Sequence, residues 1–166
     1  MDHLKKYVKI ALDDIEIFTS VNVNGVKVRG DESAEECMIR AFVETGTDGA
    51  WIEDIKKTQG TLVFAEYLAN SCSLQKWICE GRIAGVEMIK LGFIGFEKQK
   101  PKLINVTETT LKSLEQFISF KESECWPILK YILDLIYKCE NGTYVLSRSP
   151  YTPLSLKLYH LPPKEE

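Results

Sequence analysis

Histidine and cysteine side chains, the usual metal ligands and nucleophiles, are few and widely spaced in this chain. The two histidines, His3 and His160, lie at opposite ends of the 166 residues. A structural zinc site needs four nitrogen or sulfur ligands at close spacings, so we expect no metal and no cofactor. The cysteines form no CxxC pair and are interpreted as reduced thiols of an intracellular protein. They are Cys37, Cys72, Cys79, Cys125 and Cys139.

The sequence also lacks the motifs of common enzyme classes. It contains no GxSxG nucleophile elbow, no P-loop, no HExxH and no dinucleotide-binding glycine fingerprint. Two pairs of adjacent carboxylates, Asp13-Asp14 and Glu53-Asp54, are expected in helices. Neighbouring helical residues point to different faces, so neither pair forms an acid–base dyad. We therefore expect a non-catalytic protein with no small-molecule substrate.

Charge is distributed unevenly along an acidic chain. The formal net charge is −3, and residues 31–54 hold eight acidic side chains against one basic side chain, Arg40. This balance argues against a protein whose main task is to neutralise phosphates. The basic residues outside that segment predict a weak, sequence-independent contact with nucleic acid, with ordinary surface lysines as the alternative. They are Lys56, Lys57, Arg82, Lys90, Lys98, Lys100 and Lys102.

No apolar run approaches the roughly 18 residues of a membrane span. The N-terminal residues lack the apolar core of a signal peptide. We therefore expect no contact with membranes.

Apolar spacing predicts three elements in the first 45 residues. Residues 4–17 have helical spacing. Residues 21–28 alternate around Asn24-Gly25, a strong hairpin signal, because both central residues of a type I′ turn need positive φ. Ser33 and Glu36 form a capping-box pattern that predicts a helix ending near Gly46.

The remaining pattern predicts helices and hairpins in turn. A short helix over 53–58 and a longer one over 62–80 precede a hairpin of strands 83–89 and 93–96. Proline and lysines mark 98–106 as a basic linker. Helices are then expected over 108–120 and 126–138, followed by strands over 143–146 and 155–159.

Helices followed by a two-stranded wing are the winged-helix arrangement, a variant of helix-turn-helix. The expected fold class is therefore α+β, mainly helical, with tandem winged-helix domains. Residues 1–30 are interpreted as the remnant of a first winged helix, 31–97 as a winged helix and 98–106 as the linker. Residues 107–161 form a second, reduced winged helix, and 162–166 a tail.

Apolar residues divide into an expected core and an expected docking surface. The first winged helix should be built around Phe42, Trp51, Ile55 and Leu74. The second wing carries apolar residues that either bury against helix 126–138 or remain exposed as a partner site. The candidates for that partner site are Tyr144, Tyr151, Leu154 and Tyr159.

One segment resembles a known family. Residues 28–56 are similar to the central winged helix of the tandem winged-helix subunit in the RNA polymerase III initiation heterotrimer, related to TFIIE beta. The matching residues are Glu44, Gly46, Gly49, Ala50, Trp51, Asp54, Ile55 and Lys56. Looser matches are Leu74, Trp77, Ile78, Arg82, Ile83 and Val86, and the end of the chain, 156–159, is similar to the strand that closes the family's third winged helix.

The resemblance implies a shortened, divergent, non-catalytic subunit of DNA-directed RNA polymerase III that acts in promoter opening and transcription initiation. Its partners would be other RNA polymerase III subunits and initiation factors, with weak contact to promoter DNA, and its location would be nuclear. The cysteine-rich tail of many relatives has no counterpart here, so no metal is implied.

Two alternatives remain open at this point. Trafficking scaffolds of the ESCRT-II type also carry two tandem winged helices in a chain of this size. A stand-alone winged-helix DNA-binding regulator is the second alternative, although the acidic balance does not favour it.

Overall fold

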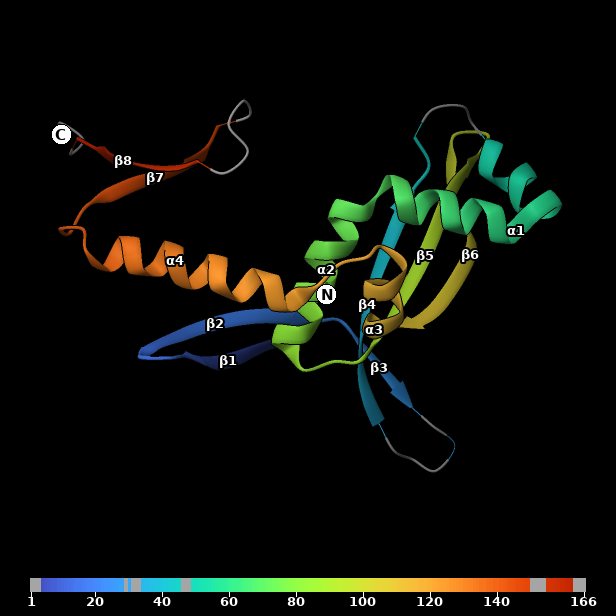
Figure 1. The fold of residues 1–166 in the computed structure, drawn as a ribbon. Helices are drawn as coiled ribbons and strands as arrows, with labels where there is room; N and C mark the ends of the chain where they lie inside the picture. The colour runs from blue at the N-terminus through green and yellow to red at the C-terminus, as the bar shows by residue number, and fades with distance from the viewer. Residues whose placement is uncertain (1–3, 29, 31–33, 46–48, 150–154, 163–166) are drawn as a thin grey trace. The chain divides into compact units, whose positions relative to one another are not determined.

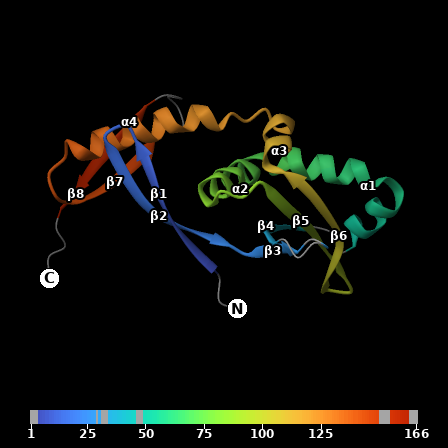
Figure 2. The same ribbon diagram turned by 90° about the horizontal axis from the view of Figure 1, so that it is seen from below.

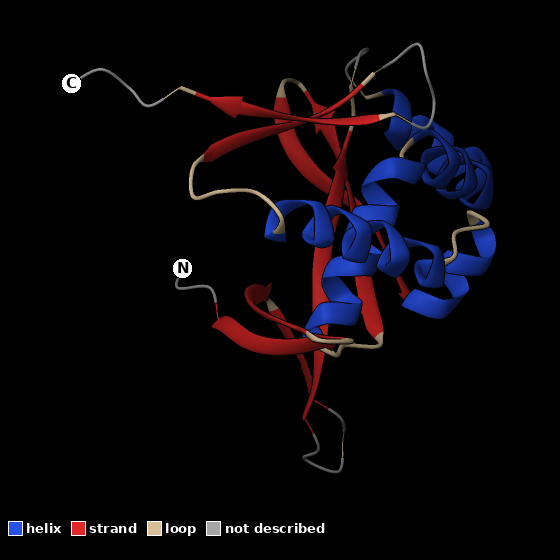
Figure 3. Cartoon of the chain, turned by 60° about the vertical axis from the view of Figure 1, so that its left-hand side comes forward, coloured by secondary structure: helices blue, strands red, loops and turns tan. Residues whose placement is uncertain are grey.

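The computed structural model describes all residues except 1–3, 29, 31–33, 46–48, 150–154 and 163–166. The chain divides into two compact units, Met1–Glu122 (unit 1) and Ser123–Glu166 (unit 2). Strands and helices both contribute strongly to the fold, as Figure 3 shows.

Unit 1 begins with an antiparallel hairpin of β1 (Leu4–Leu12) and β2 (Ile15–Val23), where the sequence predicts a helix over 4–17. The helix prediction is wrong because the apolar side chains alternate with a period of two through both strands, so each strand has one apolar face. The inner face of the hairpin contacts helix α2, and Val21 and Val23 join the core. Asp13, in the turn, adopts φ 55°, a left-handed conformation that Asp tolerates better than most residues.

Asn24-Gly25 lies where β2 ends and the first strand of the next sheet begins, so it is not a hairpin turn. Gly25 lacks the positive φ that a type I′ turn requires. The amide of Asn24 donates to the carbonyl of Ile39 over 2.9 Å, and its oxygen accepts from the Ile39 N–H over 2.8 Å. A Cβ on Gly25 would lie 2.8 Å from Cys37 Sγ, so glycine is needed for close approach to the neighbouring strand. The predicted hairpin over 21–28 is therefore wrong.

The centre of unit 1 is a four-stranded mixed sheet with the order β3-β4-β5-β6 (Figure 1). The strands are β3 (Gly25–Val28), β4 (Ala34–Val43), β5 (Met88–Glu97) and β6 (Lys100–Thr110). β4 and β5 are parallel, pairing Cys37 with Met88 through Val43 with Ile94, and the other neighbouring strands are antiparallel. A parallel pair needs a crossover connection, and helices provide it here.

The crossover consists of α1 (Ala50–Ala69) and α2 (Ser71–Ala84), and α3 (Leu111–Phe117) follows β6. These helices lie on one side of the four-stranded sheet (Figure 2). α1 is kinked at Thr58, whose φ is −153°. The predicted helix over 62–80 is divided at Asn70, which lies between α1 and α2. Gly85, with φ 70°, ends α2.

The core of unit 1 lies between these helices and the inner face of the sheet. Its completely buried side chains include Met38, Leu74, Ile78, Phe93 and Leu111. A Cβ on Gly81 would lie 2.5 Å from Leu111 Cδ1 and 2.8 Å from Met38 Sδ. Glycine at this position therefore lets α2 approach the sheet and α3 closely.

Two more segments differ from the sequence prediction. Residues 34–43 form the strand β4 although the capping-box pattern predicts a helix, because Met38 and Phe42 face the core with a period of two and the strand pairs on both edges. The proposed hairpin over 83–96 is the end of α2 followed by one strand, β5. The basic segment 98–106 forms the β5–β6 turn and most of β6.

A short 3₁₀ turn, Glu122–Glu124, begins at the last residue of unit 1 and continues into unit 2. Unit 2 then contains α4 (Cys125–Tyr137) and an antiparallel hairpin of β7 (Thr143–Arg148) and β8 (Leu156–Leu161). The predicted helix over 126–138 and the two strands after it are confirmed. Tyr144 and His160 form a cross-strand pair with ring centroids 4.8 Å apart.

The expected mainly helical, tandem winged-helix fold is wrong. A winged helix has three helices and a small wing, whereas unit 1 has a parallel strand pair at the centre of a mixed sheet. The segment that carries the polymerase resemblance forms a strand, a loop and a helix here, because residues 34–43 are extended and α1 begins only at Ala50.

Candidate functional site

Most of the basic residues predicted to contact nucleic acid are paired with acidic side chains. Arg82 binds Glu115 through Nε and Nη2 over 3.0–3.1 Å and also lies 3.3 Å from Glu122. The hydrogen bonds that Arg82 donates to the Glu115 carboxylate raise the pKa of its guanidinium. Lys90 lies 3.6 Å from Glu108. Such paired side chains are less available to phosphates.

The structure brings the predicted linker lysines together at one turn. Lys98, with φ 51°, lies between β5 and β6, and Lys100 and Lys102 follow in β6. Lys102 forms an ion pair with Glu97 over 2.7 Å, and Lys57 lies 3.7 Å from Glu53 on α1. The side chain of Lys56 lies outside the described residues. Whether this basic set binds nucleic acid stays a prediction.

The residues expected in a common core lie in the core of unit 1. Phe42, Trp51 and Leu74 are buried, and Ile55 is partly buried against them. The ring centroids of Trp51 and Phe93 are 6.0 Å apart in an edge-on arrangement. These residues stabilise the fold of unit 1.

Glu44 is a buried carboxylate with a structural role that the sequence analysis missed. It is 6% exposed, and its two oxygens accept hydrogen bonds from the backbone N–H groups of Trp51 (2.9 Å) and Phe96 (3.1 Å). The residue before α1 is Gly49, which has no side chain to cap the helix. Glu44 supplies the missing acceptor and joins the ends of β4 and β5 to the start of α1.

The predicted docking residues are only partly described. Tyr144 is half-buried and donates a hydrogen bond to the carbonyl of Glu140 over 3.0 Å, and Tyr159 is 51% exposed. Tyr151 and Leu154 lie outside the described residues. Partner docking at this hairpin stays a prediction.

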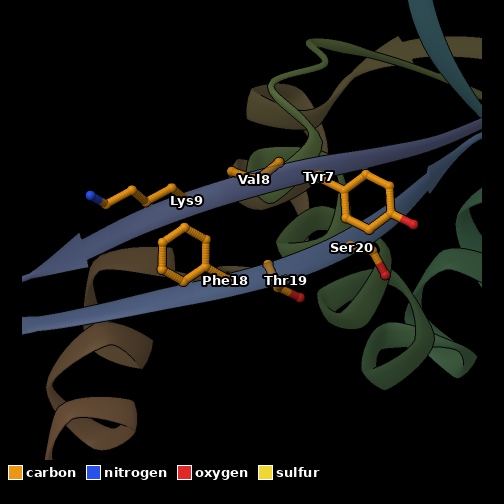
Figure 4. A pocket seen from close by; sticks show the side chains of 6 residues that line it. All are labelled: Tyr7, Val8, Lys9, Phe18, Thr19 and Ser20. Atoms are coloured by element: carbon orange, nitrogen blue, oxygen red, sulfur yellow. The ribbon is translucent and has the colours of Figure 1, made fainter.

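The outer face of the β1–β2 hairpin carries two strongly exposed aromatic rings. Tyr7 is 80% exposed and Phe18 is 75% exposed. In the strand register Tyr7 pairs with Ser20 and Lys9 pairs with Phe18, so all four side chains share one face. Figure 4 shows both rings with a face toward the viewer, set apart along the strands, the Phe18 ring near Lys9 and the Tyr7 ring near Ser20.

A shallow open pocket of about 560 Å³ lies at this face. Its walls are residues of the two paired strands: Tyr7, Val8, Lys9, Phe18, Thr19 and Ser20. Lys9 Nζ lies 5.7 Å from the Phe18 ring centroid and 2.6 Å from a carboxylate oxygen of Glu16. The ammonium group is thereby held beside an aromatic ring. The site offers flat apolar surfaces, hydroxyl groups and a positive charge to a ligand.

The sequence analysis missed this site because it placed residues 4–17 in a helix. In a helix, Tyr7 and Lys9 would point to different faces, and Phe18 would lie beyond the helix end. The available signal was the alternation of Lys5, Tyr7 and Lys9 with Val8 and Ile10, which matches an amphipathic strand.

A second exposed surface is the outer face of the four-stranded sheet, on the side away from the core. It carries the exposed aliphatic residues Ile39, Val43, Leu103 and Val106. Cys37, on the same strand, is buried, and burial raises the pKa of its thiol. Parallel strands are usually covered on both faces, which makes this open face unusual.

Two observations bear on metal and membrane chemistry. Among the described residues no three His, Cys, Asp or Glu side chains gather in a way that would hold a metal ion. Within the same residues no helix combines the length and the apolar character needed to cross a bilayer.

Comparison with solved structures defines the class of fold. The structure is similar to Rai1 from Scheffersomyces stipitis, solved alone (TM-score 0.54) and in complex with (3′-NADP)⁺ and a calcium ion (TM-score 0.57). Sequence identity is 13% in both cases, and the match covers 95% of this chain and 39–40% of Rai1. The likeness shows a shared fold.

Sequence comparison then gives the family. The family described as eukaryotic translation initiation factor 3 subunit 7 (eIF-3) matches residues 2–160, and the chain belongs to this family. It is 27% identical over 158 residues to the D-2 subunit of eukaryotic translation initiation factor 3 from Drosophila willistoni, covering 90% of this chain and 28% of that protein.

Fungal relatives support the same assignment. The D-type subunit of the same factor from Schizosaccharomyces pombe is 30% identical over 117 residues, which is 68% of this chain and 20% of that protein. Its counterpart from Botryotinia fuckeliana is 31% identical over 125 residues, which is 70% of this chain and 21% of that protein. The chain thus spans less than a third of the length of these relatives.

The family overturns the expected polymerase function. The expected family, the role in transcription initiation, the polymerase partners with promoter DNA, and the nuclear location are all wrong, because the chain belongs to a family of translation initiation factor subunits. The two alternatives, a trafficking scaffold and a DNA-binding regulator, do not fit either. A non-catalytic subunit of a larger assembly, the coarser expectation, is consistent with the family.

The resemblance misled because its residues serve general packing needs. Gly49 adopts φ 84° before a helix, Trp51 fills the core and Glu44 caps α1. Glycine, tryptophan and glutamate at these spacings therefore fit a strand–loop–helix connection as well as a winged helix.

Proposed function

We propose that this chain acts in translation initiation as a D-type subunit of eukaryotic translation initiation factor 3. The observation that carries the proposal is the family match over residues 2–160. The relatives at 27–31% identity support it. Its partners are other subunits of factor 3, and its location is the cytoplasm, where translation takes place.

The structure is compatible with an assembling role. The outer sheet face with Ile39, Val43, Leu103 and Val106 is apolar and exposed, and contiguous apolar surface of this kind often marks contact with other proteins. The proposed role of the chain is to bind and position other subunits, without catalysing a reaction.

The test is purification of the tagged full chain from its native cells, with quantitative identification of the proteins that accompany it. We expect subunits of translation initiation factor 3 to be enriched over a tag-only control. Val23→Asp, which places a charge in the core of unit 1, should abolish this enrichment, whereas Tyr137→Ala, on an exposed side chain of α4, should not. A preparation without factor 3 subunits would overturn the proposal.

A further inference from the structure

We propose that the outer face of the β1–β2 hairpin binds single-stranded RNA by stacking bases on Tyr7 and Phe18. This site goes beyond the proposed function, because assembly into an initiation factor requires no RNA contact at this hairpin. The proposal rests on exposure, register and charge.

Exposure is the first observation. Tyr7 is 80% exposed and Phe18 is 75% exposed. Neither ring therefore gains much free energy from burial in the folded protein. The inner face of the same hairpin buries Ile15, Val21 and Val23. The hairpin therefore buries its aliphatic face and leaves its aromatic face exposed to solvent.

Register is the second observation. Tyr7 is opposite Ser20 and Phe18 is opposite Lys9, so the two rings are diagonal neighbours, which in antiparallel strands are about 7–8 Å apart. Both rings turn a face toward the viewer and are set apart along the strands (Figure 4). Pairs of aromatic side chains on a sheet surface are a recurring platform on which RNA-binding domains stack successive bases.

Charge is the third observation, and it favours RNA over a protein as the ligand of this face. β1 presents Lys5 and Lys9 on either side of Tyr7 on the same face, and Lys9 forms an ion pair with Glu16 over 2.6 Å, which leaves Lys5 as the cation for a phosphate. Lys5 forms no ion pair with another described residue. Ser20 and Asn22 add polar groups on the opposite strand. A cation beside an exposed ring, with polar groups on the opposite strand, suits a phosphate backbone with stacked bases better than an apolar protein surface.

The test is fluorescence anisotropy of a labelled single-stranded oligo(A) RNA of about 10 nucleotides, within the site sizes of stacking platforms, with the full chain. Tyr7→Ala and Phe18→Ala should each weaken binding by about tenfold. Tyr7→Phe, which keeps the ring, should bind like the original chain. Phe18→Leu, which keeps apolar bulk without a ring, should lose binding. Circular dichroism and thermal unfolding establish that each variant is folded.

Matched controls make the result specific. Tyr137 on α4 is 77% exposed, close to Tyr7, so Tyr137→Ala controls for loss of any exposed tyrosine and should leave binding unchanged. An abasic oligonucleotide of the same length should bind weakly. Lys5→Gln should lower the slope of log affinity against log salt by about one unit if Lys5 contacts a phosphate.

Three outcomes overturn the proposal. They are binding that is unchanged in the Tyr7→Ala/Phe18→Ala double variant, equal binding of the abasic oligonucleotide, and loss of a protein partner in the double variant without loss of RNA binding. Co-purification of factor 3 subunits with the double variant separates this proposal from the proposed function. Retained subunits with lost RNA binding support the stacking site, and lost subunits with retained RNA binding would make the hairpin a protein contact.

Discussion

Two antiparallel hairpins of this chain, β1–β2 in unit 1 and β7–β8 in unit 2, differ in whether one of their faces is buried. In β1–β2 one face enters the core through Val21 and Val23 and the other presents Tyr7 and Phe18. In β7–β8 no described residue is buried, and the hairpin combines a Tyr144–His160 ring pair with exposed Val145 and Tyr159.

The difference shows how a hairpin becomes a binding surface. Strand alternation gives every hairpin two faces, but a face can remain free for ligands only if the opposite face fixes the strands. In unit 1 the contact of the inner face with α2 provides that support. The exposed rings of β1–β2 are therefore held in place without contributing to the core.

The largest effect is expected for a charge on the buried face. Val23→Asp should lower the free energy of unfolding of unit 1 by about 4 kcal/mol or more, because an unpaired carboxylate enters the core. The matched change in the other hairpin, Val145→Asp, should change the free energy of unfolding by about 0.5 kcal/mol, since Val145 is 44% exposed. Urea denaturation followed by circular dichroism measures both, and equal effects would remove the distinction between the hairpins.

A cavity introduced in a helix of each unit should show the same order. Leu74→Ala on α2 should cost about 3 kcal/mol, because Leu74 is completely buried and its removal leaves a void. Leu135→Ala on α4 should cost less than half as much, since no residue of α4 is buried. Trp126 is the tryptophan of unit 2, so tryptophan fluorescence of single-tryptophan variants can assign each loss to its unit.

Glu44 tests whether the rigidity of unit 1 also depends on a polar contact. Glu44→Ala should cost about 2 kcal/mol, because the N–H groups of Trp51 and Phe96 lose their acceptor. Glu44→Gln keeps one acceptor oxygen and should recover part of this loss. Chemical denaturation of both variants measures the difference. Identical stabilities of Glu44→Ala and the original chain would show that water replaces the carboxylate.

The smallest expected effect concerns Tyr67, which donates or accepts a 2.9 Å hydrogen bond with Thr107 and is 7% exposed. Burial raises the pKa of Tyr67 above its ordinary value, although the Thr107 hydrogen bond opposes the shift. The neutral phenol is therefore favoured in the folded state. Its contribution to stability is complete below about pH 10, the unfolded pKa, and is lost as the pH rises through the folded pKa.

Tyr67→Phe should accordingly cost about 1 kcal/mol at neutral pH and flatten the loss of stability above pH 10 that the original chain shows. Thermal unfolding across that pH range compares the two proteins. If both lose stability in parallel above pH 10, Tyr67 is not the group responsible.

The sequence determined the elements whose contacts are local. Helix α4 and the β7–β8 hairpin were predictable because their apolar spacing and the intervening Asn141-Gly142 lie within one short stretch. The burial of Trp51 and Leu74 also follows from residue type, because large apolar side chains gain most from leaving water.

Only the tertiary structure decided the strands β1, β2 and β4. Over short windows their apolar residues fit the helical period and the strand period equally well. Contacts with segments far away in sequence favour the strand, namely Met88–Ile94 for β4 and α2 for β1–β2. That choice also decided the candidate site. Tyr7 and Phe18 share a face only in the observed strand register, because the pairing between the strands, and no property of either residue alone, places both rings on one side of the hairpin.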